Sequence, residues 1–246
     1  MTPQEQLQKW ITESDNIVFF GGAGVSTESG IKDFRSVDGL YHENYDYPPE
    51  TILSHTFFMQ MPEEFYRFYH DKMICPDVKP NAAHLKLAEL EAAGKLKGVV
   101  TQNIDGLHQA AGSRKVFELH GSVLRNNCMK CNAFYDVQFI LDSGKEDESA
   151  VPHCTKCGGM VKPDVVLYEE GLDNEVIEGA VEAIAAADTL IIGGTSLNVY
   201  PAASLIHYFR GSQIVLINKS PTSADSMASL VISQGIGQVL GQIIVR

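Results

Sequence analysis

Continuous apolar runs of strand length recur along the chain, and amphipathic segments separate them. The runs fall at 16–20, 97–101, 116–119, 189–193, 213–218 and 230–233. Helices are expected at 3–13, 62–69, 81–93, 106–112, 175–187, 201–209 and 238–245. Apolar runs without alternation are typical of strands that are buried on both faces. The pattern therefore predicts an α/β fold, a Rossmann-like parallel sheet with helices on both faces.

This alternation fails between 126 and 159, where the chain is polar and contains the charge run 145–148. The run by itself indicates only a solvated surface. We interpret 126–159 as a small module inserted in the chain. Residues 36–75 are expected to form a loop and a helical part of the small domain. The large domain then comprises 1–35, 76–125 and 160–246.

Two Cys-x-x-Cys pairs in the inserted segment indicate a metal site. Four of the five cysteines form these pairs, and 22 residues separate Cys131 from Cys154. Four thiolates suit a closed tetrahedral zinc site, which is structural because protein atoms fill every position. The predicted ligands are Cys128, Cys131, Cys154 and Cys157. Cys75 stands apart and is expected to be an ordinary buried thiol.

Composition narrows the class of protein. The chain has 246 residues, of which 44% are hydrophobic, enough for a sizeable core. It has no apolar run of about 18 residues and no secretory signal, so we expect a cytoplasmic monomer that does not enter a membrane. The net charge of −12 disfavours nucleic acid and suits a basic partner.

Two glycine-containing loops directly follow buried strands, which is the context of a phosphate site. Gly22, Ala23 and Gly24 follow the first strand, although Thr27 stands where a dinucleotide fingerprint has its third glycine. A tight turn without a ligand would have a similar composition. A second loop contains Gly194, Thr195 and Ser196, and Asn218 ends the next strand. Several polar strand ends at one sheet edge favour a phosphate or ribose site.

Polar residues also end two other strands. Residues 102–105, Gln-Asn-Ile-Asp, follow one strand, and His120 follows another. A histidine is neutral or charged near pH 7, so His120 is a candidate general base, although a lone histidine is more often structural. Asp33, Phe34 and Arg35 lie in a long polar stretch that is typical of a functional lid.

Taken in order, these motifs resemble those of the sirtuins, the NAD-dependent protein deacylases. The resemblance covers nearly the whole chain in collinear order. It is carried by the glycine loop, the two cysteine pairs and segments 29–35, 101–105, 119–121, 162–166, 194–201 and 217–218.

The resemblance implies an NAD site between the large domain and the zinc module. The ribose, phosphate and nicotinamide portions would contact Ala23, Thr27, Phe34 and Arg35, and the nicotinamide and its ribose would contact Gln102, Asn103, Ile104 and Asp105. The adenosine half would contact Thr195, Ser196, Asn218 and Ile236. Gly22, Gly24, Ser26, Asp33 and Gly194 complete the expected NAD-binding set, and one zinc would be structural.

The implied reaction removes an acyl group from a protein lysine. The acyl oxygen attacks the anomeric carbon of NAD as nicotinamide leaves, and His120 then deprotonates a ribose hydroxyl. Asn103 is the second expected catalytic residue. The products are nicotinamide, O-acetyl-ADP-ribose and free lysine. The substrate peptide would lie as an added strand between Val165-Val166 and Asn198-Val199.

Two positions differ from a family pattern, one in the expected lid and one beneath the acyl channel. Lys32 stands where the family usually has proline. Members that remove succinyl or malonyl groups carry Tyr-x-x-Arg on a helix beneath the acyl channel, and here Tyr66 is followed by Tyr69 in place of the arginine. A neutral acyl group is therefore expected, acetyl first.

Four alternatives compete with this interpretation. A mono-ADP-ribosyltransferase or a deacylase for longer apolar chains would use the same site. A non-catalytic NAD sensor is disfavoured because Asn103 and His120 are both present. A zinc-ribbon nucleic-acid module is disfavoured by the negative charge.

Overall fold

A computed structural model describes residues 1–33, 46–145, 147 and 149–245, and its larger body is built on one parallel sheet. The strand order is β3-β2-β1-β7-β8-β9. These strands are β1 (Ile17–Gly21), β2 (Leu96–Thr101), β3 (Val116–Glu118), β7 (Thr189–Gly193), β8 (Gln213–Ile217) and β9 (Leu230–Ile232). The order reverses between β1 and β7, as in a Rossmann sheet, so the predicted fold class is confirmed.

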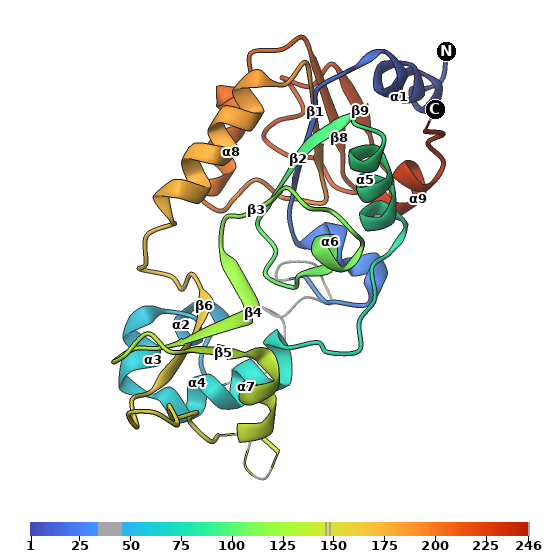
Figure 1. Cartoon of the computed structure of the whole chain (residues 1–246). Helices are drawn as coiled ribbons and strands as arrows, with labels where there is room; N and C mark the ends of the chain where they lie inside the picture. The colour runs from blue at the N-terminus through green and yellow to red at the C-terminus, as the bar shows by residue number, and fades with distance from the viewer. Residues whose placement is uncertain (34–45, 146, 148, 246) are drawn as a thin grey trace.

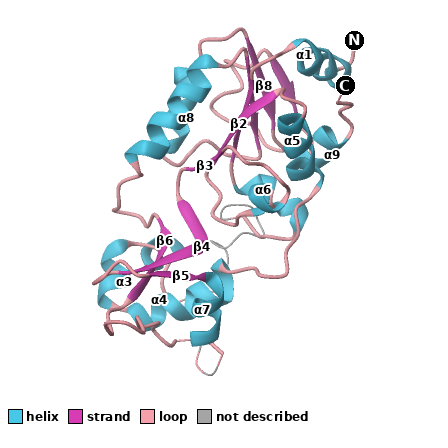
Figure 2. Ribbon diagram, in the orientation of Figure 1, coloured by secondary structure: helices cyan, strands magenta, loops and turns pink. Residues whose placement is uncertain are grey.

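Helices cover both faces of this sheet (Figures 1 and 2). One face packs against α1 (Pro3–Glu13), α5 (Ala82–Ala92) and α9 (Ile236–Gly241). The other face packs against α8 (Asn174–Ala186) and the 3-10 helix η5 (Ala202–Tyr208). Neighbouring residues of β1 point to opposite faces, since Phe19 belongs to the first core and Phe20 to the second. Both faces must therefore be apolar, which explains the continuous hydrophobic runs.

The smaller body contains an antiparallel sheet in the order β5-β4-β6. Its strands are β4 (Gly121–Cys128), β5 (Phe134–Asp136) and β6 (Val161–Val165). A third hydrophobic core joins this sheet to nearby helices. They are α2 (Pro49–Ile52), α3 (His55–Gln60), α4 (Pro62–Phe68), the π-helical turn η4 (Tyr69–Met73) and α7 (Val137–Ser143).

The structure changes several predicted boundaries. The small sheet extends from Gly121 to Val165, beyond 126–159, because β4 pairs with β6 across the cysteine segment. Helix α7 lies within the stretch that seemed aperiodic, and its Asp136 side chain accepts a hydrogen bond from the Phe139 amide as N-cap. Helix α9 ends at Gly241, four residues before the expected end.

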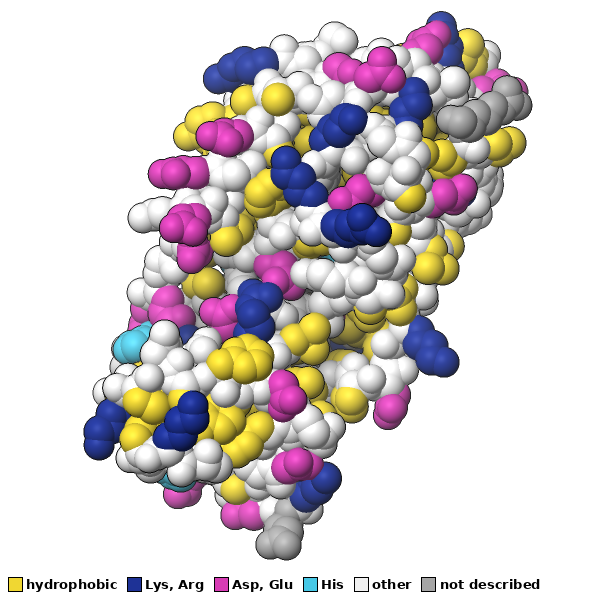
Figure 3. Space-filling view, viewed as in Figure 1, with side chains coloured by type: hydrophobic (Ala, Val, Ile, Leu, Met, Phe, Trp, Pro, Cys, Tyr) yellow, Lys and Arg dark blue, Asp and Glu magenta, His cyan; other side chains and the backbone are white. Residues whose placement is uncertain are grey.

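The two bodies differ in their surfaces. On the face in Figure 3, hydrophobic side chains gather over the smaller body, whereas charges of both signs are interspersed over the larger one. Among the described residues, none of the helices is long and apolar enough to cross a membrane.

Candidate active site

The strand ends meet where the strand order reverses. Gly21 of β1 is in register with Thr101 of β2 and with Gly193 of β7, which in turn pairs with Ile217 of β8. The residues that follow these strands therefore emerge side by side. In an open α/β sheet, this crevice is where ligands bind.

The two glycine loops contact each other through their backbones at this point. The Gly24 amide, in the 3-10 turn η1 (Ala23–Val25), donates a 2.8 Å hydrogen bond to the Gly194 carbonyl oxygen. Gly194 has a φ of +57°, and a Cβ there would lie closer than 3.0 Å to backbone atoms of Gly24 and Val25. Only glycine fits this approach.

A cavity of about 1010 Å³ begins at these strand ends and continues between the two bodies. Its volume lies near the upper limit for small-molecule pockets, which suits a large ligand. Most of the predicted site residues line it together. They are Gly22, Ala23, Gly24, Ser26, Thr27, Asp33, Gln102, Asn103, Ile104, Asp105, His120, Val165, Val166, Gly194, Thr195, Ser196, Val199, Asn218 and Ile236.

Three predicted residues are missing from this set, two of them because the structure does not describe them. Phe34 and Arg35 lie outside the described residues, as does most of the expected lid. Asn198 is exposed and does not line the cavity, although its neighbour Val199 does.

His120 is half-buried and is held by a main-chain hydrogen bond. Its Nδ1 atom lies 2.9 Å from the carbonyl oxygen of Gln102. A carbonyl oxygen only accepts, so Nδ1 carries the proton and Nε2 keeps its lone pair. Burial lowers the pKa of the imidazole, and the hydrogen bond to Gln102 opposes this shift. The geometry therefore presents a neutral imidazole that can accept a proton.

Ser26 connects the two side chains on the floor of the cavity. Its hydroxyl donates a 2.6 Å hydrogen bond to Asp105 Oδ2 and accepts a 3.0 Å hydrogen bond from Asn103 Nδ2. Asp105 Oδ1 also accepts from the Leu107 amide at 2.9 Å. These bonds fix the carboxylate and the amide in the strand-end loop that forms the floor of the cavity.

His84 is a buried member of this network that the sequence interpretation missed. Its Nδ1 atom accepts from the Asn81 amide at 3.2 Å, so Nε2 carries the proton and faces the Ser26 hydroxyl at 3.5 Å. Burial lowers its pKa, and Asp105 opposes this shift. The signal in the sequence is a histidine beside Ala83, Leu87 and Leu90, on the buried side of α5.

The structure does not place Tyr66 and Tyr69 on the cavity wall. Both are completely buried in the third core, and the Tyr66 hydroxyl donates to the Val161 carbonyl oxygen. In this segment the wall is formed instead by Lys72, Met73, Ile74 and Cys75. Tyr69, the residue on which the expectation of a neutral acyl group rests, therefore does not line the cavity. The expectation of a buried thiol at Cys75 is wrong, because this residue is exposed where the chain passes along the cavity.

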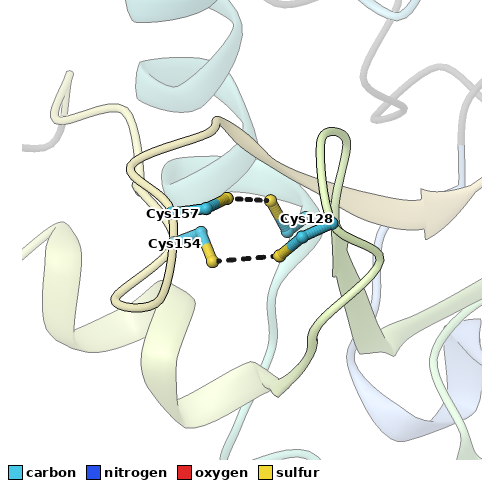
Figure 4. Close-up of side chains that lie close together, drawn as sticks. Cys128, Cys154 and Cys157 are labelled. Carbon is cyan, nitrogen blue, oxygen red and sulfur yellow. Dashed lines mark hydrogen bonds between the residues drawn. The ribbon is translucent and has the colours of Figure 1, made fainter.

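The four cysteines of the small body converge as a metal site requires. Their sulfur atoms lie within 4.8 Å of one another, and two pairs, Cys128 with Cys157 and Cys131 with Cys154, are 3.5 and 3.6 Å apart. A tetrahedron with zinc–sulfur bonds of about 2.3 Å has edges of about 3.8 Å. Figure 4 shows the sulfur atoms of Cys128, Cys154 and Cys157 directed into one space.

The surroundings of the cysteines also suit thiolates. The amides of Lys130 and Lys156 each point at a sulfur at 3.4 Å, and the Tyr135 hydroxyl donates to Cys154 Sγ at 3.2 Å. Such donors stabilise negative sulfur. With four cysteine ligands the site would be closed, and a zinc ion there would be structural.

The model of the Sir2 family matches residues 22–201, which span both glycine loops and the cysteine pairs. The chain belongs to the Sir2 family. A Clostridium perfringens member, named NAD-dependent protein deacetylase, is 64% identical over 242 residues, covering 97% of each chain. A Clostridium acetobutylicum member of the same name is 60% identical over 241 residues, covering 97% of each chain.

Solved Sir2 structures share the whole arrangement. One, described under the mechanism and regulation of Sir2 enzymes, is 39% identical, with a TM-score of 0.87 and coverage of 98% of this chain and 96% of that one. Another Sir2 holds a deacetylated p53 peptide and 3′-O-acetyl-ADP-ribose. It is 36% identical, with a TM-score of 0.89 and coverage of 96% and 95%. The Sir2 fold therefore extends over both bodies.

Proposed function

We propose that this Sir2 protein removes acetyl groups from protein lysines with NAD as co-substrate. The products are nicotinamide, O-acetyl-ADP-ribose and free lysine. The observation that carries the proposal is His120, a neutral imidazole with a free Nε2 in a cavity that begins at two crossing glycine loops. A general base beside a dinucleotide site is what the reaction needs.

The placement of NAD follows from the strand ends. The adenosine half would lie against Thr195, Ser196, Asn218 and Ile236, which follow β7, β8 and β9. The pyrophosphate would lie against the loop 22–27, most of which lines the cavity. Nicotinamide and its ribose would lie on the floor formed by Gln102, Asn103, Ile104 and Asp105. This placement is supported by the finding that all these residues line the same cavity.

The chain's own groups then account for the proton transfer. Loss of nicotinamide makes the anomeric carbon of NAD the acceptor for the acyl oxygen. His120 Nε2 would take the proton of a ribose hydroxyl, while the Gln102 carbonyl oxygen stabilises the imidazolium that forms. Asn103, held by Ser26, would orient the ribose and the attacking groups. A cavity between two bodies limits access of water to these steps.

The acylated peptide would enter beside β6. Val166 donates a 3.0 Å hydrogen bond to the His120 carbonyl oxygen, so this segment is attached directly to the catalytic loop. In the described part of the small sheet β6 is an edge strand, which suits addition of a peptide strand. Val165 and Val166 would pair with it on one side, and Val199 with Asn198 on the other. The charge of −12 supports lysine-rich substrates.

The test measures nicotinamide release and peptide deacetylation together. The protein is incubated with NAD and an acetyl-lysine peptide, as wild type, as His120→Ala and as His207→Ala, an exposed histidine on η5. We expect the wild type and the His207 variant to deacetylate and His120→Ala to lose at least about a hundredfold in rate, the usual contribution of a general base.

Mass spectrometry of the products distinguishes this reaction from ADP-ribosyl transfer. Deacetylation yields the free peptide and O-acetyl-ADP-ribose. Transfer would leave ADP-ribose on a protein and the acetyl group on the peptide. Nicotinamide release that depends on peptide but gives no deacetylated peptide would contradict the proposal.

A further inference from the structure

Glu28 does not line the cavity, but it connects two segments that do, the loop after β1 and the turn before α9. It belongs to the short 3-10 turn η2 (Thr27–Ser29), which continues directly from the first glycine loop. Its Oε1 atom accepts a 2.9 Å hydrogen bond from the Gly237 amide, 209 residues later in the chain. This bond connects the loop after β1 with the first turn of α9.

The backbone around the carboxylate is shaped to receive it. A Cβ on Gly235 or on Gly237 would lie closer than 3.0 Å to the carboxylate oxygens of Glu28. Both positions therefore need glycine for this approach. The amide that is bonded belongs to the first turn of a helix, where a negative charge is favoured.

The residue between the two glycines reaches the cavity. Ile236 is 3% exposed and lines the wall together with Gly235 and Asn218. Its side chain lies over Gly193 at the end of β7, so closely that a Cβ on Gly193 would overlap it. The position of the Gly235–Gly237 turn thus decides where Ile236 stands.

We propose that Glu28 is a positioning residue for the adenosine half of NAD, holding the Gly235–Gly237 turn and with it Ile236 against the cavity. The inference rests on the placement of adenosine under the proposed function. Glu28 follows β1, whereas Asn103 follows β2 and His120 follows β3, on the side of β1 away from β9, the strand before α9. The bond from Glu28 to Gly237 therefore does not involve the residues proposed for the chemical step. It acts on binding of the adenosine half and leaves the chemical step unchanged.

The decisive experiment compares the binding of ligands that contain the adenosine half with the rate of the chemical step. In Glu28→Ala, we expect the Kd of ADP-ribose and the KM of NAD to rise roughly threefold to tenfold, the loss expected for one hydrogen bond. The kcat at saturating NAD and the KM of the acetyl-peptide are expected to stay within twofold of wild type. Glu28→Gln keeps a carbonyl acceptor and should restore most of the affinity.

Glu91→Ala is a matched control. Glu91 also accepts from two backbone amides, those of Arg114 and Lys115 at 2.8 and 2.9 Å, and it does not line the cavity. Its loss should lower the melting temperature without changing the Kd of ADP-ribose. Gly237→Ala provides a second variant, because its methyl group would displace the Glu28 carboxylate, and it should weaken ADP-ribose in the same way.

The outcomes separate this inference from the proposed function. An unchanged Kd for ADP-ribose in Glu28→Ala would overturn it. So would an equal loss in Glu91→Ala, or a fall in kcat that accompanies the weaker binding. ADP-ribose binding is measured without turnover. If the wild type binds ADP-ribose but does not deacetylate, the proposed function fails while the role of Glu28 is still tested.

Discussion

The Nδ1 atom of His120 donates to the main-chain carbonyl oxygen of Gln102 at 2.9 Å, so the first residue after β2 sets the tautomer of the histidine after β3. Because this partner is backbone, no single side-chain replacement removes it. The relationship places the free Nε2 in the cavity and has a direct consequence for the pH dependence of the reaction.

Burial lowers the pKa of His120, and the hydrogen bond to Gln102 opposes the shift. The base is therefore still neutral at a pH where an exposed histidine, with a pKa near 6.5, is half protonated. We expect kcat/KM for deacetylation to be flat through neutral pH. Below pH 6.5 it should fall with the slope of a single protonation. A pH–rate profile checks this. An acidic limb with its midpoint above 6.5 would contradict it.

The lowered pKa of His108 predicts that the free energy of unfolding falls in acid. Burial, with a smaller contribution from His84, lowers its pKa to about 3, and the unfolded chain titrates near 6.5. Between these two pKa values, the unfolded state binds more protons than the folded state. The stabilisation is thus present above pH 6.5 and is lost as the pH falls toward 3, by up to about 1.4 kcal/mol per pH unit.

Replacement of His108 tests this directly. Neither ring nitrogen has a hydrogen-bond partner among the described residues, and the ring packs near Phe19 and His84. His108→Phe should therefore cost little at pH 7 and should reduce the loss of unfolding free energy between pH 7 and pH 5. Urea unfolding at both values measures it, with the exposed His207→Ala as control. An unchanged pH slope in His108→Phe would refute the assignment.

The contact between the two glycine loops should make a substitution at Gly194 cost more stability than one at another glycine with a positive φ. Gly94 has a φ of +75° and open space around its Cβ position, so Gly94→Ala should cost only about 1 kcal/mol of backbone strain. Gly194→Ala adds overlap with Gly24 and Val25 and should cost several-fold more or abolish NAD binding. Thermal unfolding and ADP-ribose titration compare them, and equal costs would contradict this account.

Zinc removal should unfold the smaller body. Cys128 and Cys154 belong to its hydrophobic core, and metal binding at such a site is coupled to folding. Chelation, or Cys154→Ser, is expected to lower the melting temperature and abolish deacetylation, while Cys75→Ser keeps one zinc per chain. Zinc content and circular dichroism provide the measurements. Full activity and an unchanged melting temperature after verified removal would disprove a structural role.

Much of the large body could be predicted because its rules are local. Buried parallel strands such as 17–21 and 189–193 must be apolar on both faces, so they stand out as continuous runs. Their order then places every polar strand end at one edge. The convergence of Asn103, Thr195 and Asn218 followed from topology alone, and the cavity confirms it.

The small body was harder to predict because its order comes from pairing across a long gap. Strand β4 pairs with β6 about 40 residues later, and the cysteine segment lies between them. Helix α7 has only seven residues, too few for a clear period. Tyr69 is buried and not on the cavity wall, since the direction of a side chain within an aromatic cluster depends on its neighbours.

Periodicity predicted the class of sheet and motif spacing predicted the cysteine cluster, because both are properties of neighbouring residues. The family resemblance added most of the residues that line the cavity. Only the tertiary structure decided the tautomer of His120, the link from His84 through Ser26 to Asp105, and the bond from Glu28 to Gly237. Each of these joins groups that are distant in the chain. Their contact follows from packing, which no local pattern records.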